Sequence, residues 1–218
     1  VDATLLAPFF ALNWQDDKWA IQLGGRFETM QYDYANNMNT GRVREDGTEC
    51  EFGGCRYTRP ADSEDNYNNF SPKLSLRYQL SPRIQLFGGI ARGYRAPQAT
   101  ELYRLQRAQT LAELESVTAD NVELGITGPL LKGGYTLSFY SLEKDNVIYR
   151  DSDFFNVSNG EAWHRGVELT FDQKLSDNLR VDFAGTYARH TYEHSQLSGE
   201  LDIKGNDIDT APNVLFNT

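Results

Sequence analysis

Hydrophobic and polar residues alternate with a period of two along most of the chain. From residue 69 to residue 80 the even positions are Phe, Pro, Leu, Leu, Tyr and Leu, and the odd positions are Asn, Ser, Lys, Ser, Arg and Gln. Successive side chains of a β-strand point to opposite faces, so this pattern predicts strands with one apolar and one polar face. It predicts about nine strands, at residues 3–15, 18–34, 67–80, 83–95, 119–129, 134–149, 160–175 and 178–193, with another beginning at 211.

The predicted strands are long, and the connections between them alternate in length. Globular strands average about 5–6 residues, whereas strands that cross a bilayer on a tilt need about 9–11. Short turns are expected at 15–17, 81–82, 130–133 and 176–177, and long loops near 35–66, 96–118, 150–159 and 194–210. In an up-and-down sheet every second connection lies at the same end, so the short turns share one rim and the long loops share the other. Outer-membrane barrels have this asymmetry.

A water-soluble β-sandwich is the main alternative fold, because its strands show the same alternation. Strand length, loop pattern and the aromatic residues near the strand ends favour a membrane barrel. In a barrel the apolar residues face lipid and the charged ones face inward, which requires a wide and polar or plugged lumen. The inward set comprises Arg26, Glu28, Lys73, Arg77, Glu168, Asp172, Arg180 and Asp182.

The composition argues against some classes of function and of membrane insertion. The 218 residues carry a formal net charge of -10 and no Lys/Arg-rich stripe, which argues against a nucleic-acid partner. No apolar run approaches the roughly 18 residues of a transmembrane helix. The first ten residues, VDATLLAPFF, contain no signal-peptide pattern, so none is expected there.

The two cysteines lie close together in the first long loop, as Cys50-Glu-Phe-Gly-Gly-Cys55. The two glycines permit the tight ring that a disulfide requires. A surface-exposed loop lies in an oxidising compartment, so a Cys50–Cys55 disulfide is expected, with a metal-binding pair as the alternative. The same loop holds arginines and carboxylates that indicate a solvated surface, or a site for divalent ions that bridge lipopolysaccharide.

The sequence predicts neither an enzyme nor a resident metal or cofactor. His190 and His194 are four residues apart, which on a strand is about 13 Å and too far for one ion. Asp182 and His190 lie roughly 26 Å apart along their strand, so they cannot belong to one catalytic triad. Asp202, Asp207 and Asp209 lack the register of an EF-hand calcium loop.

Residues 71–103 contain Ser71-Pro72, Ser81-Pro82, and Gly93, Tyr94, Arg95, Ala96 and Pro97 followed by Glu101, Leu102 and Tyr103. This arrangement resembles the mid-barrel region of TonB-dependent outer-membrane receptors. Further matching segments are NVELGITG (121–128), LSFYSLEKDNVI (137–148), NVSNGEAWHRGVEL (156–169) and DIDTAPN (207–213). The resemblance therefore covers nearly the whole chain.

The resemblance implies active uptake of a scarce ligand, typically a ferric siderophore, by a receptor in the outer membrane of a Gram-negative bacterium. It implies a plug domain and a TonB-binding box, and neither is recognisable in residues 1–218. It also implies a barrel of about 22 strands, so the chain is expected to be a barrel fragment. Expected partners are TonB, the small ligand, and the lipid and lipopolysaccharide of the membrane. A passive porin-like channel and a soluble carbohydrate-binding β-sandwich are the alternative functions.

Positive charge gathers around the second long loop of this acidic chain. Guanidinium groups suit carboxylates and other anions, so Arg92, Arg104 and Arg107 are predicted to bind the ligand together with Tyr103. Pairing with a carboxylate of the plug or the wall is the alternative for Arg92 and is the expectation for Arg95. Thr110 and Glu113 form a capping-box pattern that predicts a short helix at 111–116.

Overall fold

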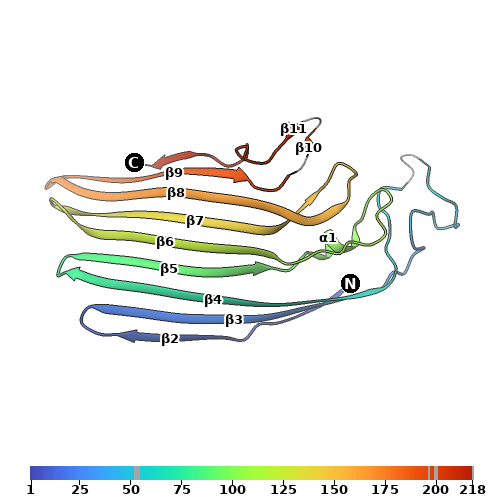
Figure 1. The fold of residues 1–218 in the computed structure, drawn as a ribbon, viewed down its shortest axis with the longest axis horizontal. Coiled ribbons are helices and arrows are strands. Elements are labelled where there is room, and N and C mark those ends of the chain that lie inside the picture. The colour runs from blue at the N-terminus through green and yellow to red at the C-terminus, as the bar shows by residue number, and fades with distance from the viewer. Residues whose placement is uncertain (52–54, 196, 199–200, 218) are drawn as a thin grey trace.

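The computed structural model describes residues 1–51, 55–195, 197–198 and 201–217. Ten strands form one antiparallel sheet with the order β1-β3-β4-β5-β6-β7-β8-β9-β12, and β2 also pairs with β3. Figure 1 shows the strands side by side in chain order. The ends of this order, β1 and β12, are not paired with each other, so the sheet is an open segment of a barrel wall.

The sheet confirms the predicted all-β, up-and-down arrangement. The elements are β1 (Asp2–Leu6), β2 (Phe9–Gln15), β3 (Trp19–Tyr34), β4 (Ser63–Ser81), β5 (Ile84–Arg95), α1 (Ala99–Tyr103), β6 (Val117–Leu130), β7 (Gly133–Arg150), β8 (Asn156–Ser176), β9 (Leu179–Tyr192), β10 (Leu197–Ser198), β11 (Leu201–Asp202) and β12 (Val214–Asn217). Each long strand begins and ends within a few residues of its predicted bounds, except that β4 and β8 begin four residues early.

Strands β1 and β2 are one strand with an interruption. Leu6 pairs with Thr29 and Phe9 with Arg26, so the register on β3 continues unchanged across Ala7 and Pro8. Proline has no N–H to donate to the ladder, which accounts for the gap. This agrees with the single strand predicted at 3–15.

The short and long connections lie at opposite ends of the sheet, as predicted (Figure 1). The third long loop is shorter than expected, because β7 and β8 extend their pairing as far as Arg150 and Asn156. Register shifts within β7, near Val147, let the two strands remain paired in this region. The fourth loop contains the small hairpin of β10 and β11.

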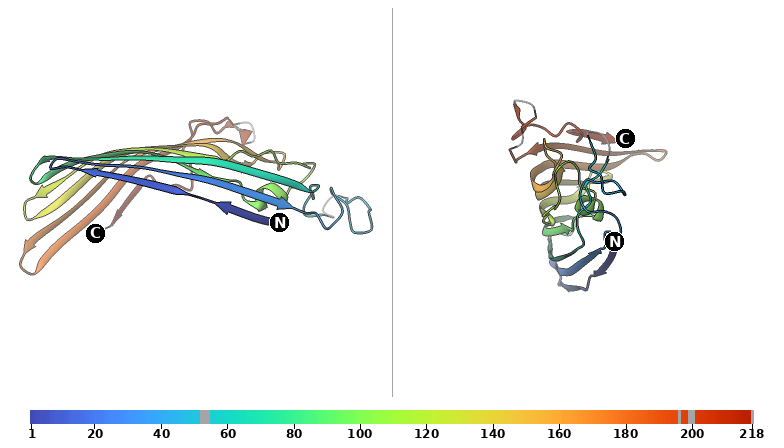
Figure 2. Two further views of the ribbon diagram at one scale, coloured as in Figure 1. Left: turned by 90° about the horizontal axis from the view of Figure 1, so that it is seen from below. Right: turned by 90° about the vertical axis from the view of Figure 1, so that its right-hand side faces the viewer.

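One face of the sheet is apolar and uncovered. Leu12, Leu23, Leu74, Ile90 and Val122 are successive cross-strand partners and form a row across five strands. Side chains of this face remain accessible, with Leu124 63% exposed. Figure 2 shows a single curved layer, and no described strand packs face to face on this surface. A sandwich would bury these residues between two sheets, so the sandwich alternative is wrong.

The opposite, concave face carries the charged residues predicted to point inward. Arg180 pairs with Asp172 at 3.3 Å and with Asp182 at 3.0 Å, and Arg26 pairs with Glu28 at 2.8 Å. The hydrophobic core cluster lies on this side, where α1 and the 96–116 loop fold beneath the sheet (Figure 2). Among the described residues, no helix is both long and apolar enough to cross a membrane.

Candidate ligand-binding loops on the concave face

The second long loop begins with a turn held by one glutamate. Glu101 accepts hydrogen bonds from both terminal nitrogens of Arg95, at 2.8 and 3.2 Å, and from the backbone N–H of Gln98 at 2.7 Å. The last contact caps α1, because Gln98 is the N-cap residue and Glu101 the third helical residue. Arg95 therefore pairs with a carboxylate of its own loop.

The predicted helix at 111–116 is wrong, because this segment has no regular secondary structure. Ala112 and Leu114 are buried, whereas Leu111 and Glu113 are exposed. This period of two fits an extended chain that directs alternate residues into the core cluster. The capping-box pattern was outweighed by tertiary packing, and the helix formed earlier in the loop at Ala99–Tyr103.

Tyrosines of β3 and α1 hold the second loop against the wall. The Tyr34 and Tyr103 rings are stacked, with centroids 4.4 Å apart and planes 6° apart. The Tyr103 hydroxyl donates to Asp65 at 2.6 Å, and the Tyr32 hydroxyl donates to the carbonyl of Pro97 at 2.9 Å. Tyr103 is only 8% exposed. The structure thus makes Tyr103 a packing residue, contrary to its expected role as a ligand contact.

Burial, together with the hydrogen bond and negative charge of Asp65, raises the pKa of Tyr103 above its usual value near 10. An acid whose pKa is raised by folding stabilises the folded state fully below its unfolded pKa, and this contribution is lost as pH rises towards the folded pKa. We therefore predict that the second loop stays docked at neutral pH and loosens above about pH 10. Protease sensitivity of the loop, followed from pH 7 to pH 11, measures this. In Tyr103→Phe the additional alkaline loosening should be absent; an identical profile in both proteins would contradict the prediction.

Arg92 lies on the apolar, convex face of the sheet. It is two residues from Ile90, and its direct cross-strand partner is Asp120, two residues from Val122. The Arg92 Nε donates to Asp120 Oδ1 at 2.6 Å, and one terminal nitrogen of the same guanidinium contacts Asp120 Oδ2. A side chain on this face points away from the concave side, so Arg92 is not retained as a ligand contact.

The other two arginines that are predicted to bind the ligand, Arg104 and Arg107, lie in the second long loop, at the end of the sheet that carries the long loops. The Arg104 guanidinium lies over the Tyr57 ring, 4.7 Å from its centroid, and the Arg107 guanidinium lies 4.7 Å from the Phe154 centroid. Such cation–π contacts orient a guanidinium group. Arg104 thus reaches the first loop, and Arg107 reaches the third.

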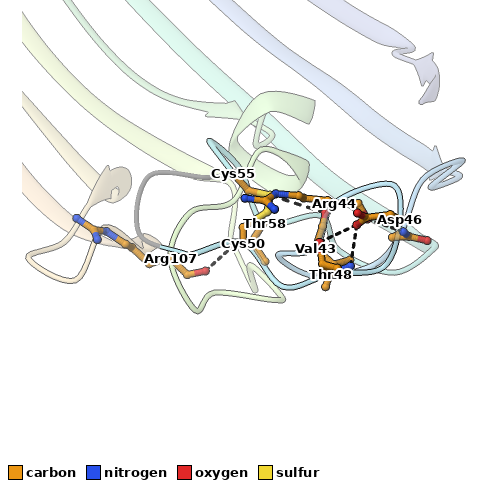
Figure 3. The surroundings of a disulfide bond; sticks show 9 residues. Val43, Arg44, Asp46, Thr48, Cys50, Cys55, Thr58 and Arg107 are labelled. Carbon is orange, nitrogen blue, oxygen red and sulfur yellow. Dashed lines mark hydrogen bonds between the residues drawn. A yellow bond between two sulfur atoms is a disulfide. The ribbon is translucent and has the colours of Figure 1, made fainter.

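A disulfide and a buried threonine organise the first loop and attach it to the second (Figure 3). Cys50 and Cys55 form a disulfide, with Cα atoms 5.5 Å apart. Thr58 is 2% exposed; its N–H donates to the carbonyl of Leu105 at 2.9 Å and its hydroxyl donates to the carbonyl of Arg107 at 2.5 Å. The backbone at Thr58 is therefore fixed next to Leu105 and Arg107.

An open cavity of about 580 Å³ lies in the first loop and is rich in arginine. Its lining residues are Arg44, Glu45, Asp46, Cys55, Arg56, Tyr57 and Arg59. One terminal nitrogen of Arg59, Nη1, is buried and has no hydrogen-bond partner among the described residues. Hydrogen bonds from the Thr48 hydroxyl and backbone lower the pKa of Asp46, so this carboxylate stays ionised. The cavity therefore offers several guanidinium donors beside fixed negative charge.

From the sequence these first-loop arginines are expected on a solvated surface or in a site for divalent ions, and Tyr57 is not identified. Their proximity to Arg104 depends on the Thr58–Leu105 bridge, which joins residues far apart in sequence. Sequence reasoning also missed that His164 and His190 are direct cross-strand partners on β8 and β9. That pairing is determined by the lengths of β8 and β9 and by the two-residue turn between them. Only these lengths could have indicated the pairing from the sequence.

The sheet is open, apolar on its convex face and charged on its concave face, and its long loops lie at one rim. These are the features of a transmembrane β-barrel wall. The family model described as "TonB dependent receptor-like, beta-barrel" matches residues 1–218. The chain therefore belongs to the TonB-dependent receptor family. This family consists of transport receptors of the Gram-negative outer membrane.

Known relatives match the chain along most of its length. The metal-pseudopaline receptor CntO of Pseudomonas aeruginosa is 27% identical over 188 residues, covering 82% of this chain and 23% of that protein. TonB-dependent heme receptor A of Haemophilus influenzae is 26% identical over 160 residues, covering 72% and 20%. The chain thus spans about a quarter of the length of these curated relatives. The ferric yersiniabactin uptake receptor FyuA of Yersinia pestis shares the fold, with a TM-score of 0.70 at 17% identity, over 98% of this chain and 30% of that one.

Proposed function

We propose that the receptor containing this chain takes up a ferric siderophore or a similar scarce metal-containing ligand across the outer membrane of a Gram-negative bacterium. TonB supplies the energy by acting on a plug domain outside this chain. Residues 1–218 form part of the barrel wall and of its extracellular mouth, by which we mean the rim that carries the long loops. The described chain performs no catalytic step: its role is to bind, orient and admit the ligand.

The observation that carries this proposal is the convergence of arginines from two loops at the open end. Arg56 and Arg104 lie against Tyr57, at 5.2 and 4.7 Å from its ring centroid, and Thr58 connects the first loop to the backbone of Arg107. In an acidic chain, this local positive charge attracts an anionic ligand to the mouth. Metal chelates rich in carboxylate or other oxygen anions have the matching chemistry.

The names of relatives support the same substrate class. They are a metal-pseudopaline receptor, a heme receptor and a ferric yersiniabactin uptake receptor. These names have a bound metal in common. We therefore infer uptake of a metal chelate or haem and leave its chemical identity to a binding screen. The apolar convex face is proposed to contact lipid and, at its extracellular end, lipopolysaccharide.

Uptake measurements separate this function from that of a passive porin. The full receptor is expressed in cells lacking their own metal-chelate receptors, and accumulation of a panel of labelled ferric siderophores, metal chelates and haem is measured with and without TonB. We expect saturable uptake of one ligand that disappears without TonB. Uptake that continues unchanged without TonB would contradict the proposal and favour a passive channel.

The mouth arginines are tested with the ligand found in that screen. We predict that Arg104→Ala and Arg107→Ala each weaken binding about tenfold or more, because a hydrogen bond to a charged group contributes about 1.5–3 kcal/mol. Arg92→Ala is the matched control, since it removes an arginine of the same barrel region from the convex face. Equal losses in all three variants would indicate a general electrostatic effect and would contradict a specific role for the mouth.

A further inference from the structure

Two histidine rings from neighbouring strands meet on the concave face. His164 on β8 and His190 on β9 are direct cross-strand partners, and their Nδ1 atoms lie 2.7 Å apart. Each is three positions from a residue of the apolar face, Val167 and Tyr187, which are also partners of each other. Side chains alternate along a strand, so both histidines project to the concave side.

The distance between the two nitrogens is close to the spacing that one metal ion imposes on two imidazole ligands. Metal–nitrogen bonds of about 2.0–2.1 Å at angles of about 90–110° place two ligand nitrogens about 2.9–3.4 Å apart. To hold one ion, the rings need to separate by a few tenths of an ångström and to rotate until both Nδ1 lone pairs point at the ion. In the metal-free pair one Nδ1–H donates to the other Nδ1. When an ion binds, the proton of the donor histidine moves to its own Nε2, so that both neutral rings present an Nδ1 lone pair to the ion.

His164 of the pair lines a cavity large enough for a small chelate, and His190 lies directly behind it as its cross-strand partner. The cavity has a volume of about 730 Å³ and is lined by Lys144, Val147, Tyr149, Arg150, Glu161, Ala162, His164, Tyr192, His194, Ile203, Asn206, Asp207, Ile208 and Asp209. The Nε2 atoms of His164 and His194 are buried and lack a hydrogen-bond partner among the described residues. Three carboxylates against two basic side chains leave the lining net acidic, which favours a cationic metal centre.

We propose that His164 and His190 bind the metal centre of the transported ligand through their Nδ1 atoms. The proposal rests on the function proposed above and specifies the ligand class: a late first-row divalent ion, Cu²⁺, Ni²⁺ or Zn²⁺, in a chelate with open coordination positions. Within the described residues, no group of three or more His, Cys, Asp or Glu side chains converges to hold an ion alone. The chelator therefore supplies the remaining ligands. Imidazole suits these ions, whereas Fe³⁺ enclosed by six oxygen ligands offers it no position.

Copper binding to the full receptor tests the pair directly. The untagged receptor is purified in detergent and titrated with CuCl₂, with electron paramagnetic resonance to detect nitrogen ligands and calorimetry to give the affinity. We expect one Cu²⁺ site with two imidazole nitrogens. His164→Asn and His190→Asn should each abolish the two-nitrogen signal and weaken binding by more than the roughly 10–100-fold that loss of an outer-shell partner costs. Asparagine retains a hydrogen-bonding group in the pair, which limits damage to the fold.

His194→Asn is the matched control, because His194 lines the same cavity but lies outside the pair. It should leave the two-nitrogen signal intact. Absence of that signal in the unmodified receptor, its persistence in either pair variant, or its loss in His194→Asn would overturn the metal-binding assignment. TonB-dependent uptake is measured in parallel. Uptake that requires TonB alongside a negative copper result overturns only this inference, whereas uptake independent of TonB overturns the proposed function.

Discussion

Replacing Leu124 by arginine is expected to destabilise the barrel by about 2–4 kcal/mol, the cost of a cationic side chain near the bilayer midplane. Leu124 is on the convex face, where it is 63% exposed in the described chain. It lies six residues from the end of β6 at Leu130. On a tilted strand this corresponds to about 15 Å from the short-turn rim, near the middle of a hydrocarbon layer of about 30 Å.

Asn121→Arg provides the matched control for this prediction. Asn121 is on the same strand but has the opposite parity to Leu124, so its side chain projects to the polar concave face. We expect only a small change there, because charges on that face remain in a wet lumen. Denaturant unfolding of the full receptor in lipid vesicles gives both values. Equal effects of the two substitutions would show that the convex face does not contact lipid.

Truncating Leu105 is expected to release the second loop from the wall. Leu105 is 1% exposed, and its backbone carbonyl accepts the hydrogen bond from Thr58. A buried Leu→Ala change typically costs about 2–5 kcal/mol. This loss of free energy is comparable to the packing free energy that holds a single loop in place. The loop should therefore undock while the hydrogen-bonded sheet remains intact. Proteolysis within residues 96–116 should increase strongly, and ligand binding should fall with it.

Leu111→Ala is the corresponding control, because it makes the same chemical change in the same loop at a side chain that is 59% exposed. It should leave protease resistance and ligand binding nearly unchanged. Barrel integrity in both variants is checked by the heat-dependent shift in electrophoretic mobility. If Leu105→Ala undocks the loop without reducing ligand binding, the mouth arginines do not depend on loop position and the proposed site is wrong.

The strands could be predicted from the sequence because their signal is local. Alternation along residues such as Leu74, Leu76 and Tyr78 directly reports which side chains share a face. The long and short connections then determine an up-and-down order, because antiparallel neighbours joined by two-residue turns have little topological freedom. The predicted helix failed for the opposite reason: a capping pattern at Thr110 carries a small local preference, and burial of Ala112 and Leu114 outweighed it.

The candidate site depended on contacts between distant segments. Arg92 and Arg104 look equivalent along the chain, yet Arg92 pairs with Asp120 on the apolar face and Arg104 lies against Tyr57 at the mouth. Tyr103 is buried because Tyr34 of β3 packs on its ring and Asp65 of β4 accepts a hydrogen bond from its hydroxyl. None of these partners can be identified from spacing within one segment.

The sequence by itself determined the class of structure: long half-apolar strands, a polar inner face and loops at one rim, because a period of two is a property of each strand alone. The tertiary structure decided which loop residues remain available to a ligand and which histidines meet. Both depend on strand register and loop docking, which are set by the summed packing of residues remote in sequence.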